Sequence, residues 1–197
     1  MMFKKSLLLA LTSLSAMAMH TAELNINNKD VEAAIHFDMG EFNTALQPAS
    51  YYLGAGVLSG GKEHSNADET DILAELNFLV QSPLPSVEGL TFGLGLKFNR
   101  TEVASESFMS LPLGIEASYR FYPFGTLPLK IGAAFYYAPA PLAFERADRY
   151  QEERIYLDLE LIRYGALTVG YRNIDTDFEQ VDMNYNDSVY AGFKFMF

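Results

Sequence analysis

Apolar and polar residues alternate with a period of two along most of the chain. The segment 90–99, for example, sets Leu94 and Leu96 against Gly95 and Lys97. Because successive side chains of a β-strand point to opposite faces of a sheet, this pattern predicts strands with one apolar and one polar face. No such segment has the spacing of an amphipathic helix. The pattern therefore predicts an all-β protein.

Nine segments alternate clearly. They are residues 30–39, 51–57, 72–80, 90–99, 111–121, 129–138, 155–162, 167–173 and 188–197. Most have the length of about nine to eleven residues that a tilted strand needs to cross a membrane, whereas strands of soluble proteins average about five or six. Residues 20–28 alternate more weakly and end at Asn27-Asn28, a candidate tight turn. Since bacterial single-chain barrels have even strand numbers, we expect ten strands, with eight as the alternative.

The polar face of these strands is rich in glycine. Its glycines are Gly54, Gly56, Gly93, Gly95, Gly114, Gly132, Gly170 and Gly192. Glycine weakens an exposed strand and needs a packing reason, which the interior of a narrow barrel supplies. The apolar face is too bulky to fill a lumen of this size, so lipid is its better neighbour. The fold expected is an antiparallel up-and-down transmembrane β-barrel with a polar interior.

The connections between the predicted strands alternate in length. If the C-terminus is periplasmic, the outer end receives long acidic connections at 59–70, 100–109, 139–153 and 174–187. The periplasmic end receives the shorter connections 82–89, 123–128 and 163–166, with 40–49 as a longer exception. Long outer loops and short periplasmic turns are typical of transmembrane barrels.

The first 18 residues have the organisation of a secretory signal peptide. Lys4 and Lys5 precede a short apolar stretch, and Ala16-Met17-Ala18 provides a small-x-small cleavage pattern. We expect cleavage after about Ala18, which leaves residues 19–197 as the barrel. This segment places the chain outside the cytoplasm, and the predicted strands place it in the outer membrane of a Gram-negative cell.

The last strand ends in a polar-x-Gly-x-x-aromatic-x-aromatic pattern. The four positions are Tyr190, Gly192, Phe195 and Phe197, with the last phenylalanine at the end of the sequence. This pattern is similar to the recognition signal of outer-membrane barrels. It predicts that the barrel-assembly machinery is a partner of this strand.

Residues 128–197 carry further motifs in a characteristic order. Phe135-Tyr136-Tyr137-Ala138-Pro139 is followed by Tyr150-Gln151-Glu152, by residues 167–174 (LTVGYRNI) and by the closing strand. In the order and spacing of these motifs the chain resembles the YfaZ family of outer-membrane proteins. The resemblance implies a small barrel, often called porin-like, and it carries over no substrate and no catalytic residue.

Composition excludes several classes of function. The net charge of −11 argues against a nucleic-acid partner, because a phosphate backbone requires a basic face. The sequence has no cysteine, so it offers no disulfide, thiolate nucleophile or thiolate metal site. After the first twenty residues no apolar run is long enough for a membrane helix. We predict no cofactor, no metal site and no catalytic residue.

Charged residues at inward positions form a candidate site in the lumen. The set consists of Glu32, Glu75, Lys97, Glu116, Arg120, Lys130, Asp158, Glu160, Arg172 and Lys194. Because unpaired charges in a narrow lumen are costly, we expect these acids and bases to form a network of ion pairs that fills the barrel. The alternative is a narrow polar channel whose selectivity these residues set.

Two charged connections suggest surface contacts. The acids of the connection 174–187 could hold a divalent cation, although a solvated loop is the more ordinary interpretation. These acids are Asp175, Asp177, Glu179, Asp182 and Asp187. In residues 145–154, Arg146, Arg149 and Arg154 are expected in a solvated loop or in contact with lipopolysaccharide.

The sequence therefore favours a non-enzymatic outer-membrane barrel, either structural or a narrow channel, with membrane lipid and lipopolysaccharide as its surroundings. A barrel enzyme acting on lipid A or surface peptides is the alternative, with only His20, His36 and His64 as candidate histidines. A soluble periplasmic barrel that binds an apolar ligand is a third interpretation.

Overall fold

The computed structural model describes residues 20–59, 72–103, 106–123, 125, 127–145, 147–178 and 181–197. The predicted signal peptide and nearly all of the predicted connection 59–70 lie outside these residues, as do His64, Arg146 and Glu179. Within the described ranges, no helix has the length and apolar character needed to cross a membrane.

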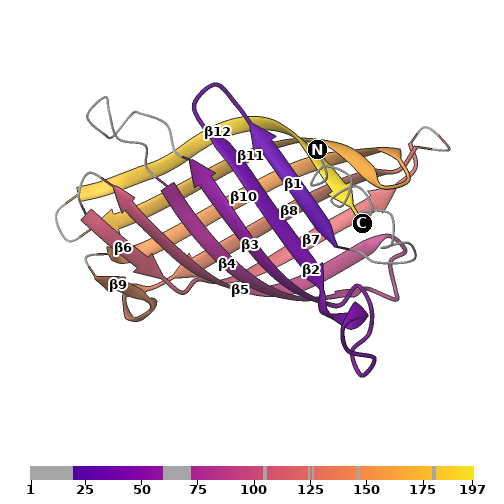
Figure 1. Ribbon diagram of the computed structural model, residues 1–197, viewed down its shortest axis with the longest axis horizontal. Helices are drawn as coiled ribbons and strands as arrows, with labels where there is room; N and C mark the ends of the chain where they lie inside the picture. Colours follow the sequence, from indigo (N-terminus) through magenta and orange to yellow (C-terminus); the bar gives the residue numbers. More distant parts are fainter. Residues whose placement is uncertain are drawn as a thin grey trace, which may run out of the picture.

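In the described part of the chain, ten antiparallel strands close into a barrel (Figure 1). They are β1 (Thr21–Ile26), β2 (Val31–Asp38), β3 (Tyr51–Ser59), β4 (Ile72–Pro83), β5 (Leu90–Val103), β7 (Leu113–Phe121), β8 (Leu129–Ala138), β10 (Ala147–Ile162), β11 (Gly165–Phe178) and β12 (Val181–Met196). Each strand pairs with the next one in this series, and β1 pairs with β12 to close the circle. The prediction of an up-and-down barrel with ten strands is confirmed.

Closure depends on β1, the weakest of the predicted strands. It pairs with β12 on one side and with β2 on the other, so neither neighbour is left with a free edge. The Asn27 side chain forms the turn into β2: its Oδ1 accepts hydrogen bonds from the backbone N–H groups of Lys29 and Asp30, at 2.6 and 2.8 Å. The six residues of β1 thus convert an open sheet into a barrel.

The structure corrects the prediction of long loops at 100–109, 139–153 and 174–187. Most of these residues are in strands: β5 continues to Val103 and returns as β6 (Glu106–Ser110), while β10 begins at Ala147. A short 3₁₀ helix, η2 (Ala140–Leu142), and β9 (Ala143–Glu145) complete this end, and β9 pairs with β6. At this end charged residues such as Glu153 lie on the outward face and apolar residues such as Phe108 and Tyr150 on the inward one, so the alternation that identifies strands in the sequence disappears there.

The two ends of the barrel differ. At the terminal end, which we define by His20 and Phe197, the backbones of these two residues exchange hydrogen bonds of 3.2 and 2.9 Å. The connection containing η1 (Met39–Glu41) lies at this end, where the Asp38 carboxylate accepts hydrogen bonds from the N–H groups of Gly40 and Ala49. Figure 1 shows β6 and β9 at the opposite end from the C-terminus, and we call this the distal end.

The outward side chains form an apolar belt around the whole barrel. Every barrel strand contributes at least one large apolar side chain that is 46% to 66% exposed. One example from each strand in chain order is Leu24, Val31, Leu53, Leu76, Leu94, Ile115, Ile131, Ile155, Val169 and Val189. The buried residues are, by contrast, largely polar or charged. This distribution is the reverse of that in a soluble protein.

Inward glycines accommodate large tyrosine rings, which is the packing reason expected from the sequence. Three tyrosines lie over the glycine directly opposite on the neighbouring strand: Tyr136 over Gly114, Tyr156 over Gly132 and Tyr190 over Gly170. A Cβ atom at Gly132 would lie 2.2 Å from the Tyr156 ring, so alanine does not fit without a shift of the ring.

Candidate functional site

The lumen contains the charged residues predicted from the sequence and four more. All ten predicted residues lie at inward strand positions, and the structure adds Glu23, Asp30, Glu152 and Arg154. Glu152 and Arg154 fall in segments predicted as loops, so the alternation did not reveal them, whereas Glu23 and Asp30 lie within the predicted segments 20–28 and 30–39 but were not included in the predicted set. The fourteen residues comprise eight carboxylates and six cations. The lumen therefore carries a small excess of negative charge.

A chain of ion pairs crosses the lumen. Glu75 of β4 lies 2.9 Å from Lys97 of β5, and Lys97 lies 2.8 Å from Glu152 of β10. Arg154 lies 3.5 Å from Glu152 and reaches Glu32 of β2 at 2.6 Å. Since β1, β11 and β12 separate β2 from β10 in the sheet, the pair formed by Arg154 and Glu32 bridges the interior instead of following the wall.

Arg172 extends this chain to a third contact across the barrel. Its guanidinium lies 2.8 Å from Asp30 and 2.8 Å from Glu32, and it is 0% exposed. Asn186 accepts a hydrogen bond from Arg172 Nε and donates one to Asp30. The Tyr190 ring lies beside the guanidinium, 5.5 Å from ring centroid to Cζ. We call the residues Asp30, Glu32, Glu75, Lys97, Glu152, Arg154 and Arg172 the ion-pair layer.

Arg154 is the clearest correction to the predicted site. The sequence pattern placed it in a solvated loop or against lipopolysaccharide, whereas its side chain points into the lumen and pairs with Glu32 and Glu152. Its neighbour Arg149 pairs with Asp177 at 2.7 Å. Both residues lie on β10, where strand geometry sends alternate side chains to opposite faces.

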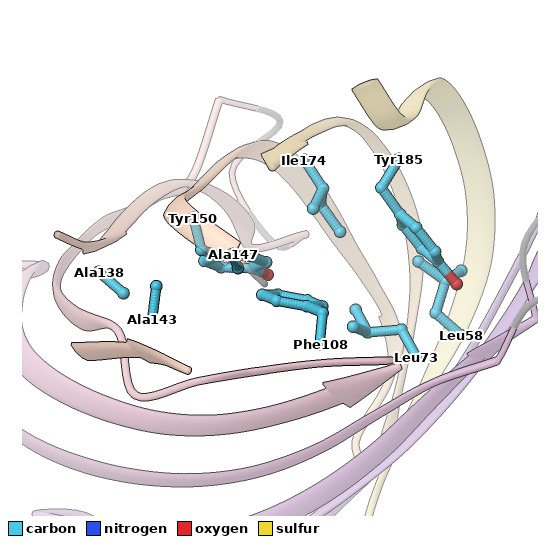
Figure 2. Close-up of a cluster of buried hydrophobic side chains, with 9 residues drawn as sticks. All are labelled: Leu58, Leu73, Phe108, Ala138, Ala143, Ala147, Tyr150, Ile174 and Tyr185. Carbon is cyan, nitrogen blue, oxygen red and sulfur yellow. The ribbon is translucent and has the colours of Figure 1, made fainter. Parts of the chain in front are cut away.

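An apolar plug closes the distal side of the ion-pair layer. Figure 2 shows its side chains gathered in the interior of the barrel, within the curve of the surrounding strands. The plug consists of Leu58, Leu73, Phe108, Ala138, Ala143, Ala147, Tyr150, Ile174 and Tyr185. The rings of Phe108 and Tyr150 stack at 5.7 Å, and the Tyr150 hydroxyl donates to Glu152 of the ion-pair layer at 3.0 Å. The alternation pattern of the sequence does not reveal this cluster.

On the terminal side of the layer lies a cavity of about 200 Å³. Its lining includes Ala34, His36, Asn77, Glu116 and Tyr156. The ring nitrogens of His36 lie 3.3 Å from Asn77 Nδ2 and 3.4 Å from Thr21 Oγ1. The cavity is bounded on one side by Glu75, Lys97, Glu152 and Arg154, so the ion-pair layer forms its floor.

Among the described residues, the lumen is accessible at the terminal end, and beyond the ion-pair layer it is filled by the side chains of the apolar plug. Side-chain exposure is 46% for Arg120 and 30% for Lys130, both near the terminal end, but only 2% for Glu152 and 0% for Arg172. This gradient follows the barrel axis. The cavity is thus a pocket whose entrance lies at the terminal end.

Charges at the entrance are also paired. Lys194 lies 3.1 Å from Glu23 and 3.0 Å from Asp158, and Lys130 lies 3.4 Å from Asp158. Arg120 pairs with Glu160. These contacts join strands on one side of the barrel, and Lys130, Lys194 and Glu23 line the cavity.

Glu116 differs from the other acids. Its carboxylate accepts a hydrogen bond from the Tyr136 hydroxyl at 2.6 Å and faces the cavity. Among the described residues, no lysine, arginine or histidine forms an ion pair with it. Glu116 therefore brings uncompensated negative charge to the cavity wall.

The residues of the predicted C-terminal signal occupy different environments. Tyr190 points into the lumen and is 3% exposed, whereas Phe195 points outward and is 53% exposed. Gly192 lies against Asn25, whose Oδ1 would be 1.9 Å from an added Cβ. The Phe197 ring packs edge-to-face on His20.

The predicted acidic loop is a β-hairpin formed by β11 and β12. Asp175 and Asp187 lie on its strands, and the carboxylate of Asp175 accepts hydrogen bonds from Asn173 and Asn184. Among the described residues, no group of three or more histidine, aspartate or glutamate side chains is arranged to hold a metal ion.

Comparisons with known proteins identify no family. No protein-family model and no curated protein sequence matches the chain. Among solved structures, the outer membrane channel DcaP of Acinetobacter baumannii aligns with a TM-score of 0.38 and 11% sequence identity. The alignment covers 89% of this chain and 54% of the channel, so this chain spans about half of the channel's length. A similarity this weak carries no argument about function.

Proposed function

We propose that the chain is a small outer-membrane β-barrel protein of porin-like architecture, with a lumen that is occluded at its distal end. The observation that carries this proposal is the apolar belt around a closed barrel whose interior is charged. Soluble monomers rarely expose contiguous apolar patches larger than about 300–600 Å². A belt to which all ten strands contribute requires an apolar solvent, and lipid supplies it.

The orientation follows from export. An N-terminal signal peptide and a C-terminal assembly signal are both consistent with a terminal end that faces the periplasm. The short connections at the terminal end support the same orientation, because short turns belong on the periplasmic side of a transmembrane barrel. The distal end, with its extended hairpins, then faces the cell exterior. Membership of the YfaZ family, which the motifs of residues 128–197 suggest, is part of the same proposal.

The interior of this barrel differs from that of an open porin. The ion-pair layer and the apolar plug occupy the distal half of the lumen, and a general diffusion pore has a water-filled channel there instead. We therefore expect a barrel that is closed at rest.

Two measurements test the proposal. The refolded protein is expected to migrate differently on a gel before and after boiling, as folded membrane barrels do, and to require detergent or lipid to stay in solution. In planar bilayers the protein is expected to produce no current above the leak. A water-soluble monomer without detergent would refute the membrane assignment, and steady open-pore currents would refute the occluded lumen.

The other two interpretations are less consistent with the geometry. A soluble barrel for an apolar ligand needs a predominantly apolar pocket, whereas the cavity here combines tyrosine rings with carboxylates, ammonium groups and amides. A barrel enzyme with a catalytic triad needs a histidine oriented by an acid and adjacent to a nucleophile. In the described contacts, His36 lies beside Asn77 and Thr21, and His20 accepts a backbone hydrogen bond from Asp38.

A further inference from the structure

The lumen has one entrance, and its contents suggest what can enter. We propose that it is a one-ended vestibule, open at the terminal end, that admits small organic cations in preference to anions. This inference rests on the proposed function, because it takes the barrel to be embedded in a membrane. It adds a ligand class and a direction of access.

The closed end of the lumen consists of two layers of side chains, one charged and one apolar, that follow each other along the barrel. The ion-pair layer spans the barrel from β2 to β4 through β10 and β5, with Arg172 adding a contact from β11. The apolar plug follows directly, and the Tyr150 hydroxyl connects the two through Glu152. A solute that enters the cavity from the terminal end therefore meets fixed charges first and packed apolar side chains behind them.

The cavity wall already binds ammonium groups in a recognisable way. Lys97 Nζ lies 4.3 Å from the centroid of the Tyr136 ring, and Lys194 Nζ lies 4.9 Å from that of Tyr156. Each of these lysines also pairs with carboxylates. The wall thus combines tyrosine faces with carboxylates, the chemistry that stabilises organic cations.

Glu116 is a carboxylate of this wall that has no ion-pair partner among the described residues. Its carboxylate faces the cavity and is held by the Tyr136 hydroxyl, so it is fixed in position and still uncompensated. Among the fourteen described charged residues of the lumen, carboxylates outnumber cations by two, and low-dielectric walls concentrate the resulting field within the cavity. A small ammonium compound gains from this field, whereas an anion of the same size is repelled.

Cysteine accessibility tests the proposal, because the sequence contains no cysteine and every labelled thiol is an introduced one. Three matched variants are Ala34→Cys in the cavity, Ala138→Cys in the plug and Ala133→Cys on the outward face of β8. Each is folded into phosphatidylcholine vesicles and exposed on both membrane faces to methanethiosulfonate reagents. One reagent carries a trimethylammonium group and the other a sulfonate, and mass spectrometry follows the labelling.

The vestibule predicts a specific pattern. Rates are divided by those of free cysteine with the same reagent, which removes the intrinsic reactivities. At Ala34→Cys the cationic reagent is expected to react roughly tenfold faster than the anionic one. Ala138→Cys is expected to stay unlabelled by both, because the plug excludes water from either side. Ala133→Cys is expected to be protected by lipid.

The outcomes distinguish a failure of the membrane assignment from a failure of the vestibule alone. Labelling of Ala133→Cys in vesicles would overturn the membrane assignment and the vestibule with it. With Ala133→Cys protected, three results would overturn the vestibule alone: no labelling at Ala34→Cys, an anionic rate equal to or above the cationic rate, or equal labelling at Ala34→Cys and Ala138→Cys.

A second pair of variants tests the role of Glu116. In the Ala34→Cys background, Glu116→Gln is expected to lower the ratio of cationic to anionic rates by roughly fivefold, because one nearby charge is removed. A neutral methanethiosulfonate should react at an unchanged rate. Glu153→Gln is the matched control, since Glu153 is exposed and accepts a hydrogen bond from Gln151 on the same strand. An equal change in both variants would refute the assignment to Glu116.

Discussion

Single residues in this barrel are constrained by what lies opposite them across the lumen. Arg172 illustrates the point, because the alternation of β11 predicts that it points inward but not that its partners are Asp30 and Glu32 on the far side of the closing strand pair. Period-two patterning determines which face a side chain occupies. The partner depends on barrel closure and register, which pattern alone does not specify.

Replacing Arg172 should strongly destabilise the barrel. Arg172→Met removes the cation between two buried carboxylates, and breaking a buried ion pair in this way costs about 3–5 kcal/mol. Urea titration of the barrel refolded in detergent measures the loss in free energy of unfolding. Arg163→Met, at an exposed position in the turn between β10 and β11, is expected to cost less than about 0.5 kcal/mol. Equal effects of the two variants would contradict a structural role for the ion-pair layer.

The pairing of tyrosine with glycine gives a second prediction at this scale. Gly132→Ala places a methyl group against the Tyr156 ring, and overpacking of this kind costs about 1–3 kcal/mol. Gly56→Ala is the matched control, because an added Cβ there meets nothing closer than 3.5 Å. The same urea titration compares both variants. Restoration of stability by Tyr156→Leu in the Gly132→Ala background would identify the ring as the cause.

Among the strands, the sequence predicts those parts that lie within the apolar belt and misses those beyond it. Residues 129–138 were predicted with the observed bounds of β8, because each outward residue there is apolar and each inward one is small or polar. By contrast, residues 147–154 of β10 carry charges on both faces, and their strand character comes from pairing with β8 and β11. The apolar plug was missed for this reason, since Phe108 and Tyr150 belong to such segments.

We propose that the last strand has two separable roles, in closing the barrel and in targeting it for assembly, and this gives a prediction at the scale of the element. Deleting Phe197 removes two backbone hydrogen bonds with His20 and an edge-to-face ring contact, all at the very end of the last strand, so the purified barrel is expected to refold with little loss of stability. In cells the same deletion should lower the amount in the outer membrane several-fold, because the assembly signal loses its final aromatic residue. Membrane fractionation measures this, with Tyr164→Ala, an exposed aromatic change in the turn between β10 and β11, as the control. Normal levels of the deletion variant would refute the assembly signal.

At the scale of the whole molecule, the lumen is closed by two barriers that differ in kind. The ion-pair layer braces strands that are not neighbours in the sheet, whereas the plug fills the distal interior by packing. A barrier of fixed charges repels or retains ions, and a packed apolar region excludes water altogether. We therefore expect either barrier alone to prevent conduction.

This arrangement predicts how conductance depends on the two barriers. Removing the plug with Phe108→Ala and Tyr150→Ala should leave planar-bilayer current at the leak level, because the ion-pair layer remains. Removing the charged bridge with Lys97→Ala and Glu152→Ala should also leave the barrel closed, because the plug remains. The four changes together are expected to open a continuous path, and the excess of carboxylates in the remaining lumen should make its current cation-selective.

The measurement is the current at a fixed voltage, followed by the reversal potential under a gradient of potassium chloride. Gel migration before and after boiling establishes that each variant is folded, so that a silent variant is not an unfolded one. Conduction by either two-residue variant would contradict the two-barrier arrangement, since one barrier would then carry the closure alone. Anion selectivity in the four-residue variant would contradict the charge assignment of the lumen, because eight carboxylates and six cations reduce to seven and five when Glu152 and Lys97 are both removed.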